Sequence, residues 1–135
     1  MEHTERWTVP ARLSAVPTSR AWLGRYLTGL DLRPDLVDTA ELLVSELVTN
    51  SARHALTGAI SVTVRLTADR LVVEVQDDDP LPPSLVVATP DDTGGRGIGM
   101  LGRAAAEWGV ADHGPSGKAV WFALPLSESD MSTES

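Results

Sequence analysis

The most informative segment of this 135-residue chain runs from Glu41 to Ala55 and reads ELLVSELVTNSARHA. Its apolar residues, together with those just upstream, recur at the three- and four-residue spacings of an amphipathic helix. At roughly 100° per residue, they fill one broad arc of the helix surface. The members of this arc are Leu36, Ala40, Leu43, Val44, Leu47, Val48 and Ser51. We therefore predict a long helix with one buried face.

Two polar residues of this helix, Glu46 and Asn50, are candidates for a chemical role. Glu46 lies on the side opposite the apolar arc, and Asn50, one turn later, lies about 40° from it and nearer the edge of the arc. A carboxylate and a carboxamide on the shoulder of a buried face suit the orientation of a nucleophile and the binding of a metal ion. From the helix alone, the ordinary alternative is favoured: Glu46 is solvated and Asn50 helps to end the helix.

Composition narrows the classes of protein that this chain can represent. Eleven basic residues against nineteen acidic ones give 11 − 19 = −8, so the chain lacks the basic footprint for direct binding of nucleic acid or an anionic membrane. It has no cysteine, which excludes disulfides and thiolate metal sites and fits a reducing compartment. The N-terminus has neither the charge nor the apolar region of a signal peptide. We expect a cytoplasmic protein.

Periodicity and helix-breaking residues predict the other elements. Pro34 suits the first turn of the long helix, and Thr57-Gly58 breaks it after about Leu56. The other predicted elements are a strand at 6–11, a helix from Ser14 or Thr18 to Thr28 with Gly29 as its stop, a hairpin of strands at 60–66 and 71–76, a long connection at 80–97, a helix at 98–107, and strands at 108–111 and 118–124. Apolar residues on both faces of the last strand predict a central strand, and we expect Trp108, Trp121 and Phe122 in the core.

This order of elements predicts an α+β fold. The economical arrangement is a two-layer α/β sandwich, with the helices on one face of a mainly antiparallel sheet. Residues 1–126 are predicted to form a single domain, followed by a disordered acidic tail at 127–135. The connection at 80–97 is long for a compact domain, which is typical of a lid or of disorder.

Asp77 is the second candidate for a chemical role. The inward row Leu71, Val73, Val75 continues by period two to Asp77. A buried carboxylate needs a partner, and the amino group of a flat ligand such as adenine is one good partner. The alternative, which we weigh equally at this point, is that Asp77 only begins a turn.

A glycine-rich segment forms the third candidate. Gly94 to Leu101 reads GGRGIGML and lies immediately before the predicted helix, where backbone N–H groups at a helix N-terminus can cradle phosphate. After Arg70, the only basic residues are Arg96, Arg103 and Lys118, and two of these flank the glycines. Glycines also occur in flexible hinges and arginines on ordinary surfaces, so this segment alone is a weak signal.

Taken in order, these segments resemble the Bergerat-fold (GHKL) ATPase superfamily of gyrase, heat-shock chaperones and histidine kinases. The likeness is strongest to the small anti-sigma-factor serine/threonine kinases of actinobacterial type, and it covers about Arg6 to Pro125. Residues 46–54, ELVTNSARH, resemble the first box of that family, and Gly95, Gly97 and Gly99 resemble its glycine box. Residues 117–122 resemble its last strand.

The resemblance implies a site for ATP and Mg²⁺. It implies that Glu46 is the catalytic general base, that Asn50 is the magnesium ligand, and that Asp77 accepts a hydrogen bond from the adenine amino group. The nucleotide-binding residues that it implies are Asn50, Arg53, Asp77, Gly95, Arg96, Gly97, Ile98, Gly99 and Met100. The implied partners are an anti-anti-sigma protein of STAS type or a sigma factor, and a homodimer is possible in this family.

The chain departs from the family pattern in two places. The second box usually has glycines at the positions of Asp79 and Leu81, and a threonine often follows the last-strand glycine, where this chain has Lys118 and Ala119. Three hypotheses therefore stay open: a serine/threonine protein kinase, a nucleotide-gated binding module with little or no kinase activity, and an interaction protein that binds no nucleotide. We favour the first over the second, and both over the third.

Overall fold

The computed structural model describes residues 2–54, 58–78, 107–112 and 117–126. Two helices and five strands lie in this part of the chain. In order they are β1 (His3–Pro10), α1 (Ala15–Gly29), α2 (Pro34–His54), β2 (Ala59–Leu66), β3 (Arg70–Asp77), β4 (Glu107–Asp112) and β5 (Lys118–Pro125). None of the helices described is long and apolar enough to span a membrane.

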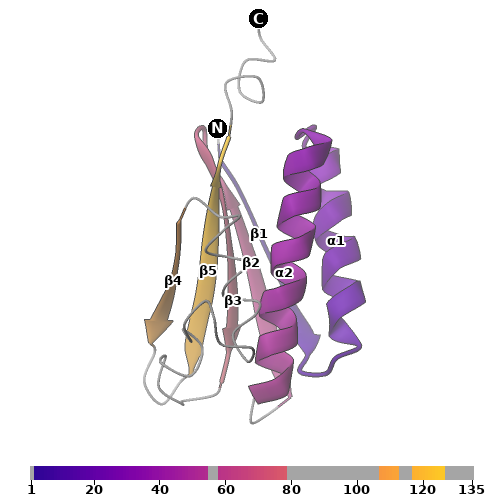
Figure 1. Ribbon diagram of the computed structural model, residues 1–135, viewed down its shortest axis with the longest axis vertical. Coiled ribbons are helices and arrows are strands. Elements are labelled where there is room, and N and C mark those ends of the chain that lie inside the picture. The colour runs from indigo at the N-terminus through magenta and orange to yellow at the C-terminus, as the bar shows by residue number, and fades with distance from the viewer. Residues whose placement is uncertain (1, 55–57, 79–106, 113–116, 127–135) are drawn as a thin grey trace, which may run out of the picture.

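The strands form one antiparallel sheet in the order β1-β2-β3-β5-β4. Both helices cover the same face of this sheet, and the other face carries no helix from the described residues (Figure 1). The predicted α+β sandwich is therefore confirmed. The hairpin of β2 and β3 is also confirmed, and β5 lies between β3 and β4, as the apolar residues on both of its faces predict.

The helix-facing side of the sheet consists of matched apolar rows. In β3, Leu71, Val73 and Val75 are buried, and they pair across to Leu124, Phe122 and Val120 of β5. Asp77 ends the β3 row and is itself buried. The period-two pattern thus predicts the correct face for each of these side chains, because successive residues of a strand point to opposite sides of the sheet.

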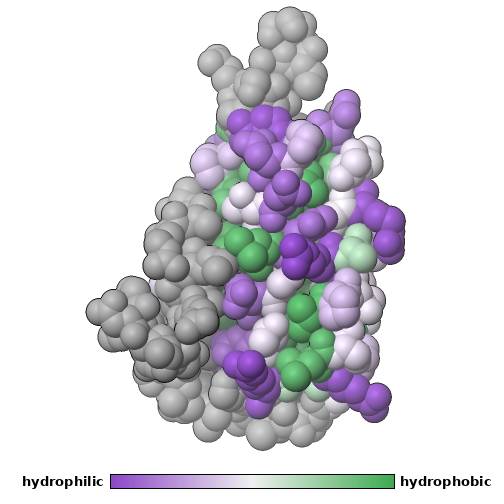
Figure 2. All heavy atoms as spheres, turned by 45° about the vertical axis from the view of Figure 1, so that its right-hand side comes forward, coloured by the Kyte–Doolittle hydropathy of each residue, from purple (hydrophilic) through white to green (hydrophobic). Residues whose placement is uncertain are grey.

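Helix α2 supplies the opposing layer of the core. Each residue of its predicted apolar arc is buried, and α2 packs against β2, β3 and β5. Helix α1 lies beside α2 and buries Leu23 and Leu27. The outer surface of the two helices is mostly hydrophilic, with only small hydrophobic areas (Figure 2).

Several predicted boundaries differ from the structure. β1 begins at His3 rather than Arg6, because pairing with β2 extends to the His3–Leu66 pair. Ser14 precedes α1 but makes no side-chain cap. Gly29 is still helical, and the left-handed residue beyond the helix is Asp31, with φ of 69°. Aspartate tolerates this conformation better than most non-glycine residues.

The aromatic residues of the last two strands divide between the two faces of the sheet. Phe122 is fully buried in the core, and Trp108, its cross-strand partner, packs against that core. The prediction of a core position for Trp121 is wrong, because Trp121 pairs with Glu74 and Gly109 on the helix-free face. Glu107, predicted as the last helical residue, begins β4. The predicted connection at 80–97, the rest of the helix at 98–107 and the tail at 127–135 lie outside the described residues.

Candidate functional site

Helix α2 carries both polar residues of the first candidate motif. Glu46 and Asn50 are half-buried and lie one turn apart, next to the fully buried Leu47 and Val48. Arg53 is exposed. Side chains at i and i+4 lie one above the other on the helix surface, so the carboxylate and the carboxamide occupy the same shoulder of α2.

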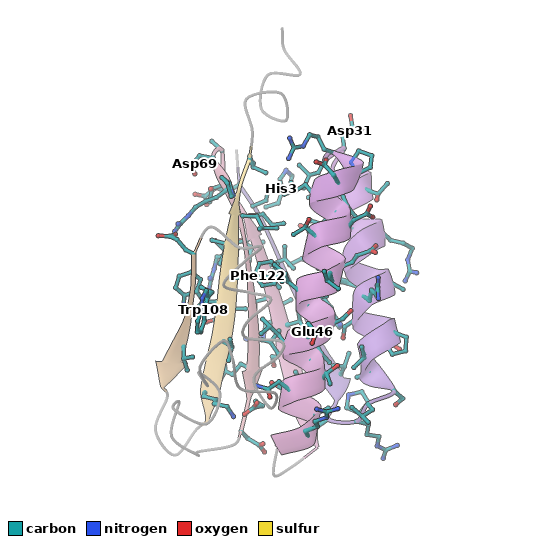
Figure 3. All side chains as sticks on the ribbon, in the orientation of Figure 1. His3, Asp31, Glu46, Asp69, Trp108 and Phe122 are labelled. Carbon is teal, nitrogen blue, oxygen red and sulfur yellow. The ribbon has the colours of Figure 1, made fainter. Side chains whose placement is uncertain are left out.

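The elements of the candidate site converge at one end of the molecule. Figure 3 labels Asp31, just before α2, and Asp69, just before β3, at the upper end, while Glu46 lies in the lower half of α2. Helix α2 and strand β3 therefore run in the same direction and finish at the lower end (Figure 1). Because β5 is antiparallel to β3, its first residues lie there too. The second half of α2, the end of β3 and the start of β5 thus lie at the same end of the molecule.

A buried ion pair lies at this end of the sheet. Asp77, the last residue of β3, is 3% exposed, and Lys118, the first residue of β5, is 2% exposed. The two are direct cross-strand partners. Lys118 Nζ donates to Asp77 Oδ1 at 3.2 Å and to Oδ2 at 3.4 Å. The cation compensates a carboxylate that would otherwise be costly to bury.

Gly117 shapes the backbone beside this pair. Its φ of 114° lies in the region that L side chains rarely adopt, and a Cβ there would collide with the carbonyl oxygen of Asp77. Glycine at this position lets β5 begin directly against the end of β3. The close approach of the two strand ends brings Lys118 to Asp77.

The carboxamide of Asn50 is the candidate magnesium ligand at this end of the described chain. The described residues contain no cluster of three or more His, Asp or Glu side chains that could hold a metal ion by themselves. Magnesium commonly keeps several waters and binds through one or two protein oxygens plus substrate phosphates. The carboxamide oxygen of Asn50 is suited to be one such ligand. The predicted phosphate-binding residues Gly95, Arg96, Gly97, Ile98, Gly99 and Met100 lie outside the described residues.

A separate hollow lies on the helix-free face of the sheet. It has a volume of about 380 Å³, and Trp121, Val72 and Ala111 contribute its apolar wall. Arg65 and Glu74 both line the hollow and form an ion pair. Arg70, which also lines it, pairs with Glu107. This hollow is on the side of the sheet opposite α2, so it is not the predicted nucleotide site.

Comparison with known proteins identifies the family. Residues 9–124 match the family model of the histidine kinase-like ATPase domain. Among solved structures, the chain is similar to the histidine kinase domain from the blue-light activated histidine kinase of Erythrobacter litoralis EL346, with a TM-score of 0.51 and 28% identity. That match covers 70% of this chain and 46% of the other, so this chain spans less than half of that protein. No curated protein matches the sequence.

The chain therefore belongs to the family of histidine kinase-like ATPase domains. This membership supports the binding of ATP, which ATPase domains usually bind together with Mg²⁺. It agrees with the resemblance to the GHKL superfamily that the sequence motifs indicate.

Sequence reasoning missed one residue of this region. Lys118 appears in the sequence as a lysine in a turn, and only the strand register brings it against Asp77. A signal was nevertheless present. Lys118 begins a strand whose alternate residues Val120, Phe122 and Leu124 form a core row, and it is the only lysine in the chain.

Proposed function

We propose that this protein is an ATP-dependent regulator of the anti-sigma-factor type, which binds Mg·ATP and phosphorylates a serine or threonine of a partner protein. The proposed partner is an anti-anti-sigma protein of STAS type, and sequestration of a sigma factor is the other regulatory role of such a protein. Membership of the ATPase family supports the binding of a nucleotide. The kinase activity and the partners are our proposals.

One observation carries this proposal. Glu46 and Asn50 share the half-buried shoulder of α2, and that helix packs against the strands that present Asp77 and Lys118 at the same end of the molecule. A residue that orients the nucleophile and a residue that holds the metal ion are among the groups that a nucleotide-dependent phosphoryl transfer requires from the protein, and Glu46 and Asn50 are suited to these two tasks.

Each group has a distinct task in the proposed reaction. Asp77 would accept a hydrogen bond from the purine amino group, and Asn50 would hold the magnesium ion. Glu46 would orient the partner's hydroxyl and accept its proton while the hydroxyl oxygen bonds to the γ-phosphorus and the bond to the β-phosphate oxygen breaks, which releases ADP. The metal ion, when bound, neutralises charge on the phosphates.

The test is phosphate transfer from γ-labelled ATP to a purified STAS-type partner. We expect Glu46→Gln to reduce transfer by 100-fold or more, at about the scale of general-base removal, while ATP binding is retained. Glu41→Gln is the matched control, because Glu41 lies on the same helix but faces Arg20 of α1. Undiminished transfer by Glu46→Gln would remove Glu46 from the proposed role.

A nucleotide-gated binding module is the second candidate function. The absence of glycine at Asp79 and Leu81 favours it, since glycine lets the backbone come close to a base. In such a module, ATP would change the affinity for the partner without phosphate transfer. Calorimetric titration distinguishes the two functions: saturable ATP binding by a protein that labels no partner supports the module.

A further inference from the structure

The buried pair of Asp77 and Lys118 has a location that ordinary core packing does not explain. Both residues lie on the helix-facing side of the sheet, in line with the apolar rows of β3 and β5. Lysine is almost never fully buried unless it is paired. Replacing a buried ion pair by apolar side chains is often neutral or stabilising, so stability alone is a weak reason to have the pair there.

The pair presents two complementary hydrogen-bonding groups side by side. The Asp77 carboxylate is an acceptor with about four lone-pair positions, and the Lys118 ammonium is a donor with three protons. Their register is fixed, because they are cross-strand partners at adjoining strand ends and Gly117 holds the two backbones close together. The spacing of donor and acceptor is therefore built into the sheet.

Adenine carries the matching pattern on its Watson–Crick edge. Its exocyclic amino group is a donor, and the adjacent ring atom N1 is an acceptor. We infer that Lys118 is a base-recognition residue, which donates a hydrogen bond to N1 of adenine while Asp77 accepts one from the amino group. This inference rests on the proposed nucleotide site and adds to it a specificity determinant at the position where the related kinases often have a threonine.

The charge of Lys118 determines how strong the inferred hydrogen bond should be. Hydrogen bonds in which one partner is ionised are about twice as strong as neutral ones. A site built to hydrogen-bond a ligand atom also discriminates strongly against an analogue that lacks this atom, because its own polar group is then left unpaired. The contact should therefore change the affinity by about tenfold or more, which corresponds to about 1.4 kcal/mol.

The experiment compares ATP with 1-deaza-ATP, in which a C–H group replaces N1. Dissociation constants are measured by isothermal titration calorimetry with Mg²⁺ for the wild type, for Lys118→Met and for Arg70→Met. We expect the wild type to bind 1-deaza-ATP at least tenfold more weakly than ATP. Lys118→Met should bind ATP more weakly than the wild type does. Its dissociation constants for ATP and 1-deaza-ATP should be nearly equal.

Arg70→Met is the matched control for loss of a cation. Arg70 lies at the opposite end of β3, where it pairs with Glu107 on the surface, so this variant should keep the wild-type ratio. Circular dichroism and a thermal melt establish whether each variant is folded. If Lys118→Met does not fold, the wild type still tests the inference, because equal affinity for ATP and 1-deaza-ATP would overturn it.

Three outcomes would overturn the inference. The first is equal affinity of the wild type for ATP and 1-deaza-ATP. The second is a folded Lys118→Met variant whose dissociation constants for the two ligands have the same ratio as those of the wild type. The third is tighter ATP binding by Lys118→Met, which would mean that Lys118 competes with the base for Asp77. In each of these cases ATP still binds, and the proposed nucleotide site survives. Failure of the wild type to bind either ligand would instead overturn that site together with the inference.

Discussion

At the scale of single residues, the candidate site depends on the polar groups at the boundary of the core. Glu46 and Asn50 are half-buried on α2, while Asp77 and Lys118 are almost fully buried at the strand ends. Such groups are costly to place in a core unless they are paired or bind a ligand. Gly117 has a comparable importance, because its backbone conformation allows the two strand ends to meet.

Replacement of Gly117 tests this backbone requirement. We expect Gly117→Ala to reduce the free energy of unfolding by about 2 kcal/mol or more, since the new Cβ strains a φ of 114° and collides with the Asp77 carbonyl. Gly29→Ala, at the end of α1, is the control. No atom lies within 4 Å of a Cβ there, and alanine should stabilise the helix by up to about 1 kcal/mol. Equal urea midpoints for the two variants would contradict the assignment of strain to Gly117.

At the scale of elements, α2 joins the core to the site. One face of the helix fills the space above β2, β3 and β5, and the shoulder of the same helix carries Glu46 and Asn50. The packing of the apolar face therefore determines the position of the polar residues. Helix α1 supports α2 from the side and brings an aromatic pair, Trp22 and Tyr26, whose rings stack with centroids 5.3 Å apart.

Two adjacent leucines of α2 test the burial of its apolar face. Leu43 is fully buried, whereas Leu42 is 37% exposed. We expect Leu43→Ala to reduce the free energy of unfolding by about 2–5 kcal/mol, through lost apolar contacts and the cavity left behind. Leu42→Ala should change it by less than about 0.5 kcal/mol. Urea denaturation measures both, and similar losses would contradict the orientation of α2.

The pH dependence of stability provides a test of the packing of α1. Burial, and secondarily the charge of Glu5, raise the pKa of Tyr26 above its ordinary value of 10.0. The folded state then holds the phenolic proton more tightly than the unfolded state does. The resulting stabilisation is complete below about pH 10 and is lost as the pH rises through the raised pKa.

We expect the wild type to lose stability more steeply above pH 10 than Tyr26→Phe does. Comparison with this variant removes the contribution of every other group that titrates in this range. Tyr26 is the only tyrosine in the chain, so the absorbance of its phenolate reports its titration directly. Parallel pH profiles for the two proteins would exclude a raised pKa of Tyr26.

At the scale of the whole molecule, the fold is an open two-layer structure. Five antiparallel strands are covered by helices on one face (Figure 1), and the parts of α2, β3 and β5 that carry the candidate site residues lie toward the same end. A ligand bound between the layers would contact both of them. Its binding should therefore stabilise the molecule as a unit.

Thermal unfolding measures this coupling between ligand and fold. At a free concentration of 100 times its dissociation constant, Mg·ATP should raise the free energy of unfolding by about 2.7 kcal/mol and increase the Tm accordingly. We expect Asn50→Ala to lose the part of this increase that depends on Mg²⁺, because the variant lacks the proposed ligand oxygen. Thr39→Ala, in the first half of α2, should retain it. A Tm that is independent of Mg·ATP in the wild type would contradict nucleotide binding.

The sequence by itself determined the layers of this protein and the buried rows of α2 and β3, although it placed Trp121 wrongly in the core. Hydrophobic periodicity follows directly from helix and strand geometry, so the arc of α2 and the row that ends in Asp77 are readable without coordinates. The pairing of β3 with β5 joins segments that are 41 residues apart at Asp77 and Lys118, and no local pattern encodes that register. Only the tertiary structure therefore brought the lone lysine to the buried carboxylate, because a non-local contact depends on how the whole sheet assembles.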